Sequence, residues 1–121
     1  MERIAEGEYA VMEVLWEESP LTAAEVAERV PPGRGWSLAT VKTMLSRLLA
    51  KGALAHEQDG RRYLYRPAFA REDYVAEESG RLIDRMFGGR LTPLVAHLAA
   101  RDRLTDADIE EIEALLKELK S

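Results

Sequence analysis

The fold follows from SLATVKTMLSRLLAKGALAHEQDGRRYLYRP, the stretch Ser37–Pro67. Its first part predicts a helix over about residues 37–51. Ser37 is a favourable N-cap residue, because its hydroxyl accepts a hydrogen bond from a free backbone N–H of the first turn. Gly52 suits the left-handed position that follows the last turn. Apolar residues between them recur at the 3.6-residue spacing of one buried face: Leu38, Val41, Leu45, Leu48 and Leu49.

The opposite face of this helix is narrow and polar. At about 100° per residue it carries small or hydrogen-bonding side chains with one arginine in the middle: Ala39, Thr40, Thr43, Ser46, Arg47 and Ala50. A face that only meets solvent is usually rich in glutamate and lysine. A face this slim fits a groove of DNA, so the pattern indicates a recognition helix.

The residues after Gly52 predict a β-hairpin over about residues 54–66. Its loop contains Asp59-Gly60, a dipeptide that readily takes the positive φ angles of a type I′ turn. A two-residue loop at this point places Glu57 opposite Arg62 and leaves Arg61 without a carboxylate across from it. A slim-faced helix followed by an arginine-tipped hairpin is typical of the winged-helix version of helix-turn-helix DNA binding.

The residues before Ser37 complete this arrangement. A first helix over residues 8–18 has one apolar face and ends at Ser19-Pro20. The sequence TAAE, which begins at Thr22, is a capping box that opens a short helix through Val30. Trp36 is expected to pack the following turn onto the first helix. The order of elements predicts a mostly α protein with a small β-hairpin, in which residues 1–70 form a winged helix-turn-helix domain.

The charge is distributed unevenly along the chain. The whole sequence carries a formal net charge of −5, which is unusual for a protein that binds DNA. Residues 34–66 nevertheless carry +5, against −6 for residues 1–33 and −4 for residues 67–121. The positive excess therefore lies on the predicted helix and hairpin, where binding to a polyanion needs it.

Composition excludes several functional classes. The chain has no cysteine and only two histidines, His56 and His97, so we expect no disulfide, no metal site and no cysteine nucleophile. No paired nucleophile and base is recognisable, and Gly33-x-Gly35 lacks the rest of a dinucleotide-binding motif, so we expect neither catalysis nor a cofactor. No 18-residue apolar run and no secretory leader pattern occur. This favours a cytoplasmic protein without a membrane span.

Residues 71–121 predict a second region, made of three short amphipathic helices. Gly88-Gly89 ends the first, Thr92-Pro93 starts the second and Leu104-Thr105-Asp106 starts the third. Three such helices cannot easily bury all their apolar faces against one another, so we expect an interleaved, symmetric homodimerisation domain. The alternative, that they fold back on the first domain, stays open. The expected interface residues are Tyr74, Leu82, Ile83, Met86, Phe87, Leu94, Leu98, Ile109, Ile112, Leu115, Leu116 and Leu119.

Several stretches together carry a resemblance to a known family: EYAVMEVLW (Glu8–Trp16), LTAAE (Leu21–Glu25), WSLATVKTMLSRLLAKG (Trp36–Gly52), GRRYLY (Gly60–Tyr65) and FGG (Phe87–Gly89). The chain resembles the penicillinase-repressor family of bacterial winged-helix regulators, which control β-lactamase, methicillin-resistance and copper genes. The resemblance spans nearly the whole sequence. It implies a homodimer that binds an inverted-repeat operator and blocks transcription.

The resemblance leaves the inducing signal open. The copper-responsive branch uses a cysteine-rich tail, and this chain has no cysteine, so copper release by that route is excluded. In the β-lactam branch a membrane sensor-protease cuts an Asn-Phe bond, and the aligned position here is His97-Leu98. The resemblance thus implies a sensor-protease partner, while the residues do not support the same cleavage specificity. The operator sequence and the regulated genes also stay open.

The expected DNA contacts lie on the helix and the hairpin: Ala39, Thr40, Lys42, Thr43, Ser46, Arg47, Lys51, Arg61 and Arg62. Arg47 is expected to reach a guanine edge or a phosphate, with a solvated arginine as the alternative. Lys42 suits a phosphate, and Thr43 suits either a thymine methyl group or no contact. On the wing, Arg61 is the stronger candidate for a phosphate or minor-groove contact, because Glu57 is expected to form an ion pair with Arg62.

Two functions of different class fit these observations. The first is a dimeric DNA-binding repressor. The second is a winged-helix module for protein–protein interaction, in which the basic segment over residues 34–66 meets an acidic partner. Binding to an inverted-repeat duplex that weakens steeply with salt separates the first from the second.

Overall fold

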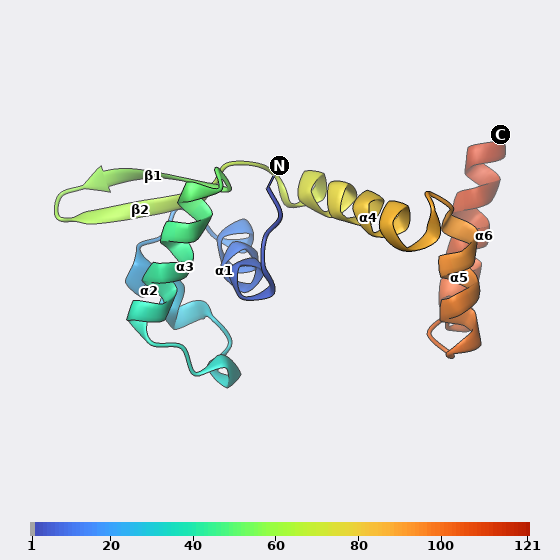
Figure 1. Ribbon diagram of the computed structural model, residues 1–121, viewed down its shortest axis with the longest axis horizontal. Coiled ribbons are helices and arrows are strands. Elements are labelled where there is room, and N and C mark those ends of the chain that lie inside the picture. Colours follow the sequence, from blue (N-terminus) through green and yellow to red (C-terminus); the bar gives the residue numbers. More distant parts are fainter. Residues whose placement is uncertain (1) are drawn as a thin grey trace. The chain divides into compact units, whose positions relative to one another are not determined.

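The computed structural model describes residues 2–121, and the chain divides into two compact units between Glu78 and Ser79. The first unit is a three-helix core with a two-stranded hairpin and the start of a fourth helix (Figure 1). Its elements are α1 (Glu6–Glu17), α2 (Ala23–Arg29), the 3₁₀ turn η1 (Pro32–Arg34), α3 (Leu38–Ala50), β1 (Leu54–Asp59), β2 (Arg62–Pro67) and the first turns of α4 (Arg71–Phe87). This order confirms the mostly α winged-helix fold.

The core of the first unit is built where α1, α2 and α3 pack together. Most of the apolar positions that the sequence predicts become buried or half-buried, but Leu38, which was expected on the buried face of α3, lies in its first turn and is 42% exposed. Met12 and Leu15 of α1 and Leu45 and Leu48 of α3 are fully inaccessible to solvent, and Val26 of α2 closes the layer. Burial of each large aliphatic side chain contributes about 1.5–3 kcal/mol. These contacts fix α3 with its opposite face turned to solvent.

Local hydrogen bonds set the ends of the helices. The Ser37 hydroxyl accepts a hydrogen bond from the backbone N–H of Thr40, which confirms the predicted N-cap of α3. Thr22 and Glu25 form the predicted capping box of α2. After α3, Gly52 has a φ of 75° and so takes the left-handed conformation that ends the helix.

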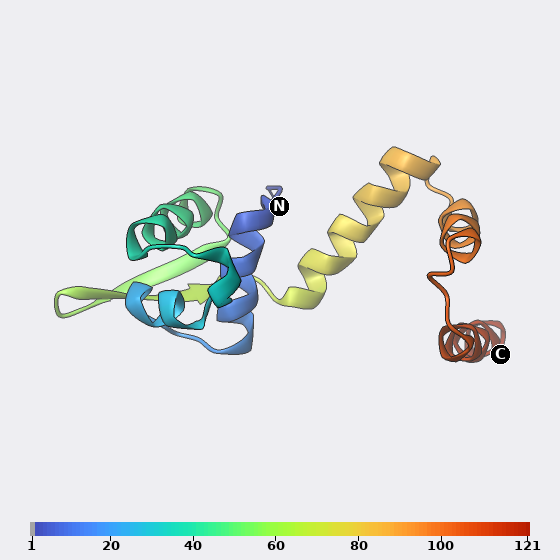
Figure 2. The ribbon, with the colours of Figure 1, turned by 90° about the horizontal axis from the view of Figure 1, so that it is seen from below.

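The hairpin projects beyond the three helices as a wing (Figure 2), and its register differs from the prediction. Asp59 pairs with Arg62, so the two-residue loop is Gly60-Arg61 rather than Asp59-Gly60. Gly60, with a φ of 66°, occupies the first loop position, where a type II′ turn places its glycine. The predicted type I′ turn needs two positive φ angles and would force one of them on Asp59. The observed loop needs only one, and glycine adopts it without strain.

Two further contacts attach other segments to this core. Leu21 forms a single β-bridge with Tyr65, so the residue before α2 is joined to the wing. Trp36 and Met44 lie against Gly7 of α1, where an added Cβ would come within 3.3 Å of the Met44 methyl carbon. Gly7 therefore permits a close approach, and Trp36 packs the turn onto α1 as predicted.

An aromatic cluster joins α1 to the start of α4. The indole N–H of Trp16 donates to the backbone carbonyl of Phe69 at 3.0 Å, and the Trp16 and Tyr74 rings lie 5.9 Å apart. The Tyr74 hydroxyl accepts a hydrogen bond from the backbone N–H of Ile4, and Tyr74 is only 4% exposed. Tyr74, one of the twelve expected interface residues, therefore lies in the core of the first unit.

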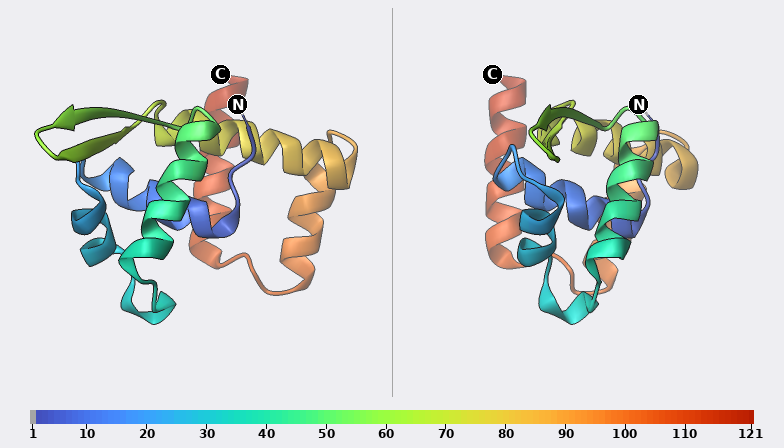
Figure 3. Two further views of the ribbon diagram at one scale, coloured as in Figure 1. Left: turned by 60° about the vertical axis from the view of Figure 1, so that its left-hand side comes forward. Right: turned by 90° about the vertical axis from the view of Figure 1, so that its left-hand side faces the viewer.

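The second unit consists of the remaining part of α4, α5 (Leu91–Ala100) and α6 (Asp106–Lys120). Gly88 and Gly89 both have positive φ and end α4, while Thr105 caps α6 through a reciprocal bond with Asp108. The chain reverses between α5 and α6 (Figure 3). No residue of this unit is buried. None of the described helices combines the length and apolar character that crossing a bilayer requires.

Candidate nucleic-acid interface

The exposed face of α3 holds most of the expected contact residues. Packing of the opposite stripe into the core turns this face outward, and five of the expected contact residues on α3 are exposed: Ala39, Lys42, Thr43, Ser46 and Arg47. Thr40, in the first turn, is half-buried. The face therefore presents methyl groups, a hydroxyl and two cations along a helix narrow enough for the major groove.

The hydroxyl groups at the start of this face are used within the helix. The Thr43 Oγ1 donates to the backbone carbonyl of Ala39 at 3.0 Å. The Thr40 Oγ1 lies 3.2 Å from the Ser37 Oγ, within the N-cap arrangement. Ser46, by contrast, makes no side-chain hydrogen bond within the part of the chain that the structure describes. The threonines are therefore oriented by the helix itself.

Of the lysines and arginines expected to contact DNA, some already bind acidic groups of the protein and others do not. Lys51 is half-buried and donates to Glu8 Oε1 and to the backbone carbonyl of Arg3. Arg62 binds Asp59 at 3.1 Å, rather than the Glu57 carboxylate that the predicted register placed opposite it. Among residues 2–121, Lys42, Arg47 and Arg61 have no carboxylate within ion-pair distance. The free cations thus lie on the middle of α3 and at the tip of the wing.

Glu8 provides the counter-charge beneath the recognition helix. Its side chain is only 3% exposed, and its Oε1 accepts hydrogen bonds from the Ala5 backbone N–H and from Lys51. Burial disfavours the charged form and is the largest single influence. The hydrogen bonds from Lys51 and Ala5 and the charges of Lys51 and Arg47 outweigh it, and they hold the pKa of Glu8 below its usual 4.5. Glu8 therefore stays ionised at neutral pH.

Two further arginines lie near the interface: Arg34, which the sequence offers as a weaker phosphate candidate, and Arg66, which was not among the expected contacts. The Arg34 guanidinium lies 5.0 Å from the centre of the Trp36 ring, a cation–π geometry that orders it just before α3. Arg66 is exposed on β2, on the same strand face as Arg62. The Arg34-x-Trp36 spacing was visible in the sequence. The four-residue spacing of Arg62 and Arg66 was visible as well, because residues four apart in a strand lie on the same face.

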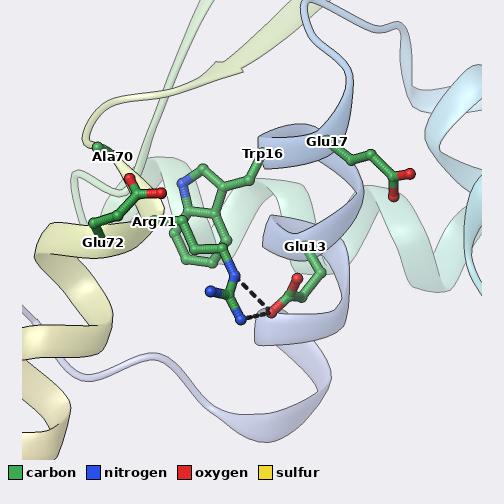
Figure 4. Close-up of a pocket in the computed structure, with 6 residues that line it drawn as sticks. All are labelled: Glu13, Trp16, Glu17, Ala70, Arg71 and Glu72. Carbon is green, nitrogen blue, oxygen red and sulfur yellow. Dashed lines mark hydrogen bonds and ion pairs between the residues drawn. The ribbon is translucent and has the colours of Figure 1, made fainter. Parts of the chain in front are cut away.

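A surface pocket of about 450 Å³ lies between α1 and the start of α4 (Figure 4). The side chain of Arg71 crosses it, and its Nε and one Nη nitrogen each lie 3.3 Å from Glu13 Oε1. Trp16 forms one wall but directs its N–H to Phe69. No buried polar side-chain atom in the described chain lacks a partner. The pocket therefore contains no buried polar atom that a ligand would have to satisfy, and we assign it no ligand.

A core-packed helix with a slim outer face, preceded by a shorter helix and followed by a projecting hairpin, defines the winged-helix class of helix-turn-helix proteins. Comparison with known proteins narrows the class. The chain belongs to the penicillinase repressor family, whose family model matches residues 4–118. This is a family of transcriptional repressors and not of enzymes.

Named relatives align over almost the entire chain. The penicillinase repressor of Bacillus licheniformis is 34% identical over 119 residues, which is 98% of this chain and 93% of that protein. The methicillin resistance regulatory protein MecI of Mammaliicoccus sciuri is 26% identical over 113 residues, or 93% of this chain and 92% of that protein.

A solved structure resembles more than half of the chain. Monomeric Bacillus licheniformis BlaI in complex with the blaP half-operator is 38% identical, with a TM-score of 0.52. The match covers 60% of this chain and 89% of that one. That protein was solved in complex with its half-operator DNA.

Proposed function

We propose that this chain is a homodimeric transcriptional repressor that binds an inverted-repeat operator through α3 and the wing. The observation that carries the proposal is the α3 face, where Thr43 and Arg47 are exposed beside a wing whose tip carries the free cation Arg61. The net charge of +5 over residues 34–66 supports it. The 38% identity to BlaI bound to a half-operator supports the choice of DNA as the partner.

The contact residues divide by the chemistry that they offer. Arg47 is assigned to a guanine edge, which accepts a bidentate contact at O6 and N7. Ala39, Thr40, Thr43 and Ser46 are assigned to base edges or to the adjacent backbone, and Lys42 and Arg61 to phosphates. Arg62 is 64% exposed in its ion pair with Asp59, and surface pairs of this kind exchange readily, so it remains a phosphate contact.

Lys51 has a different place in the proposal. Its ammonium group is committed to Glu8 and the Arg3 carbonyl, and its side chain is 26% exposed. A phosphate contact by Lys51 would have to replace the bond to a buried carboxylate. We therefore assign Lys51 chiefly to holding the recognition helix in place.

The second unit is assigned to dimerisation. Several of its apolar side chains are largely exposed: Met86 and Leu91 are each 61% exposed, Leu115 is 60% exposed and Leu119 is 81% exposed. A second copy of the chain that packs on these faces would remove them from water. Of the expected interface residues we keep the eleven from Leu82 to Leu119 and omit Tyr74, because the first unit already buries it.

Dimerisation gives the mechanism of operator selection. One wing-and-helix unit alone binds weakly, whereas a linked second unit meets the second half-site at high effective concentration. Half-sites about 34 Å apart, one turn of DNA, or a multiple of that distance suit such a dimer. An operator that overlaps a promoter then blocks transcription. This role places the chain in the cytoplasm, where the DNA is.

Release from DNA follows when the two copies separate. The family resemblance suggests that a membrane sensor-protease cuts within the second unit. The aligned bond, His97-Leu98, lies inside α5, with His97 exposed and Leu98 half-buried. A helical bond must unwind locally before a protease can hold it in an extended form. We therefore propose that loosening of α5, by proteolysis or by another signal, controls repression.

A mobility shift with the full-length chain tests the proposal. Genomic fragments that the protein retains are sequenced, and the recovered inverted repeat is compared with a scrambled duplex at several salt concentrations. A repressor binds the repeat tightly and loses affinity steeply as salt rises. Equal, weak binding to both duplexes would overturn the proposal. It would favour the protein–protein interaction module, which needs no operator.

A further inference from the structure

The side chain of Thr43 is locked in one orientation on the recognition face. Its Oγ1 donates to the Ala39 carbonyl at 3.0 Å, one turn earlier in α3. A threonine in a helix divides between two rotamers because of this type of bond, and the bond selects one of them. Thr43 is exposed, so its γ-methyl and the acceptor lone pairs of its oxygen are the groups that it still presents to a partner.

The engaged hydroxyl changes what Thr43 is able to read. A free threonine hydroxyl donates to or accepts from several base edges and therefore discriminates poorly. Because the Thr43 hydroxyl already donates its hydrogen bond to the Ala39 carbonyl, the side chain has no free donor for a base. The 5-methyl group of thymine is the one apolar group that a base presents in the major groove, and threonine methyl groups contact it.

Ala39 extends the same apolar surface. It lies four residues before Thr43, so the two Cβ atoms are neighbours about 5–6 Å apart on the helix surface. The side chain of Ala39 is exposed and consists of a methyl group only. Arg47 follows Thr43 by another four residues, or about 6 Å along the helix axis. The face thus runs from methyl groups to a guanidinium.

We infer that Thr43 is a specificity-determining residue whose γ-methyl contacts the 5-methyl group of a thymine in each operator half-site, within a few base pairs of the base that Arg47 reads. The inference rests on the proposed function, because it assumes that α3 enters the major groove. It goes further by naming the base and the atoms that meet.

The test removes one methyl group at a time from either side of the contact. In the operator recovered by selection, each thymine of one half-site is replaced singly by deoxyuridine, which lacks only the 5-methyl group. Affinity of the full-length protein is measured by fluorescence anisotropy at one salt concentration. We expect one position at which the replacement weakens binding about fourfold, the effect of one buried methyl group.

Two matched variants identify the protein atom. Thr43→Ser keeps the hydroxyl and loses the γ-methyl, so deoxyuridine should no longer weaken its binding at that position. Thr43→Val is isosteric, keeps the methyl and loses the hydroxyl, so the fourfold effect should persist. Thr43 is exposed, and thermal unfolding followed by circular dichroism checks that both variants remain folded.

The outcomes separate this inference from the proposed function. Tight operator binding without any deoxyuridine-sensitive position, or with equal sensitivity in Thr43→Ser, would overturn the inference and leave the repressor function standing. Loss of binding in Thr43→Val alone would show that the hydroxyl oxygen is read instead, which also overturns it. A wild-type protein that binds no duplex would reject the proposed function, and the inference with it.

Discussion

The Lys51 ammonium lies 2.5 Å from Glu8 Oε1, which ties the end of the recognition helix to the first turn of α1. The same carboxylate oxygen accepts the backbone N–H of Ala5, and Lys51 also donates to the Arg3 carbonyl at 3.0 Å. One ion pair thus joins segments 43 residues apart. It holds α3 by its last turn, while the core packing holds it by its inner face.

Replacement of Lys51 by methionine is expected to destabilise the protein by about 2–3 kcal/mol. The variant leaves a buried carboxylate with the Ala5 N–H alone, and removing one partner of a buried pair costs more than the pair contributes. The cost falls below that of a fully buried pair because the Lys51 side chain is 26% exposed. Urea unfolding followed by tryptophan fluorescence measures the change.

The matched control is Lys42→Met on the same helix. Lys42 is exposed and has no carboxylate partner in the described chain, so its loss is expected to change stability by less than about 0.5 kcal/mol. The double variant Glu8→Gln/Lys51→Met should recover part of the loss, since no unpaired charge remains. Equal unfolding midpoints for Lys51→Met and Lys42→Met would contradict the structural role.

The Glu8 pair also predicts a dependence of stability on pH. Its folded-state pKa is held below 4.5, so ionised Glu8 stabilises the fold fully above the unfolded value. This contribution is lost as the pH falls from 4.5 through the lower folded-state pKa. The free energy of unfolding of the wild type, minus that of Glu8→Gln, should therefore be constant near pH 7 and shrink below about pH 4.5.

Urea unfolding at a series of pH values between neutral and acid measures this difference. In the Lys51→Met background the same comparison should be flatter, because the hydrogen bond from Lys51 is the strongest of the influences that lower the Glu8 pKa. A wild-type difference that stays constant down to acid pH would show that Glu8 is not stabilised as a carboxylate.

Features that depend on neighbouring residues were predictable from the sequence. The caps at Ser37, Thr22 and Thr105 each involve residues three positions apart, and the core stripes follow from helical periodicity. The exposed face of α3 followed from the same periodicity. These features need no knowledge of how distant segments meet.

Features that depend on distant partners were not predictable. Periodicity indicates that Tyr74 has an apolar environment but not which one, and the structure places it against Trp16. Lys51 was expected to face DNA because nothing local revealed its contact with Glu8. The wing register rested on a choice between two turn types that both suit Gly60, and only the pairing of Asp59 with Arg62 decides it.

The Arg47→Ala and Arg61→Ala variants are expected to lose DNA affinity in different ways. Arg47→Ala should lower affinity for the operator by about 1–3 kcal/mol and affinity for random duplex much less, if it reads a base. Arg61→Ala should weaken both similarly and reduce the slope of log affinity against log salt by about 1, as loss of a phosphate contact does. Anisotropy titrations at four salt concentrations measure both.

Arg62→Ala is the control on the wing, because Arg62 already has Asp59 as a partner. Its effect on affinity should be smaller than that of Arg61→Ala. If Arg47→Ala lowers the affinity for the operator and for the random duplex equally, Arg47 contacts a phosphate and not a base. Unchanged operator affinity in both Arg47→Ala and Arg61→Ala would argue against the whole interface.

The dimer is expected to depend on the apolar face of α6. Leu116→Glu places a charge among Ile109, Ile112 and Leu119, and burial of an unpaired carboxylate in an interface is strongly unfavourable. Sedimentation velocity should show the variant as a monomer at concentrations where the wild type is a dimer. Glu113→Gln, an exposed polar change on the same helix, should leave the dimer intact.

Operator binding then separates assembly from recognition. The Leu116→Glu monomer keeps α3 and the wing, so its affinity for a duplex with a single half-site should match the affinity of the wild-type protein for the same duplex. Its affinity for the full inverted repeat should fall by about 10²–10⁴, because the second unit is no longer held at high effective concentration. Deletion of residues 104–121 should act in the same way. A Leu116→Glu protein that still sediments as a dimer would place the interface elsewhere, since no dimer with α6 at its centre accommodates that charge.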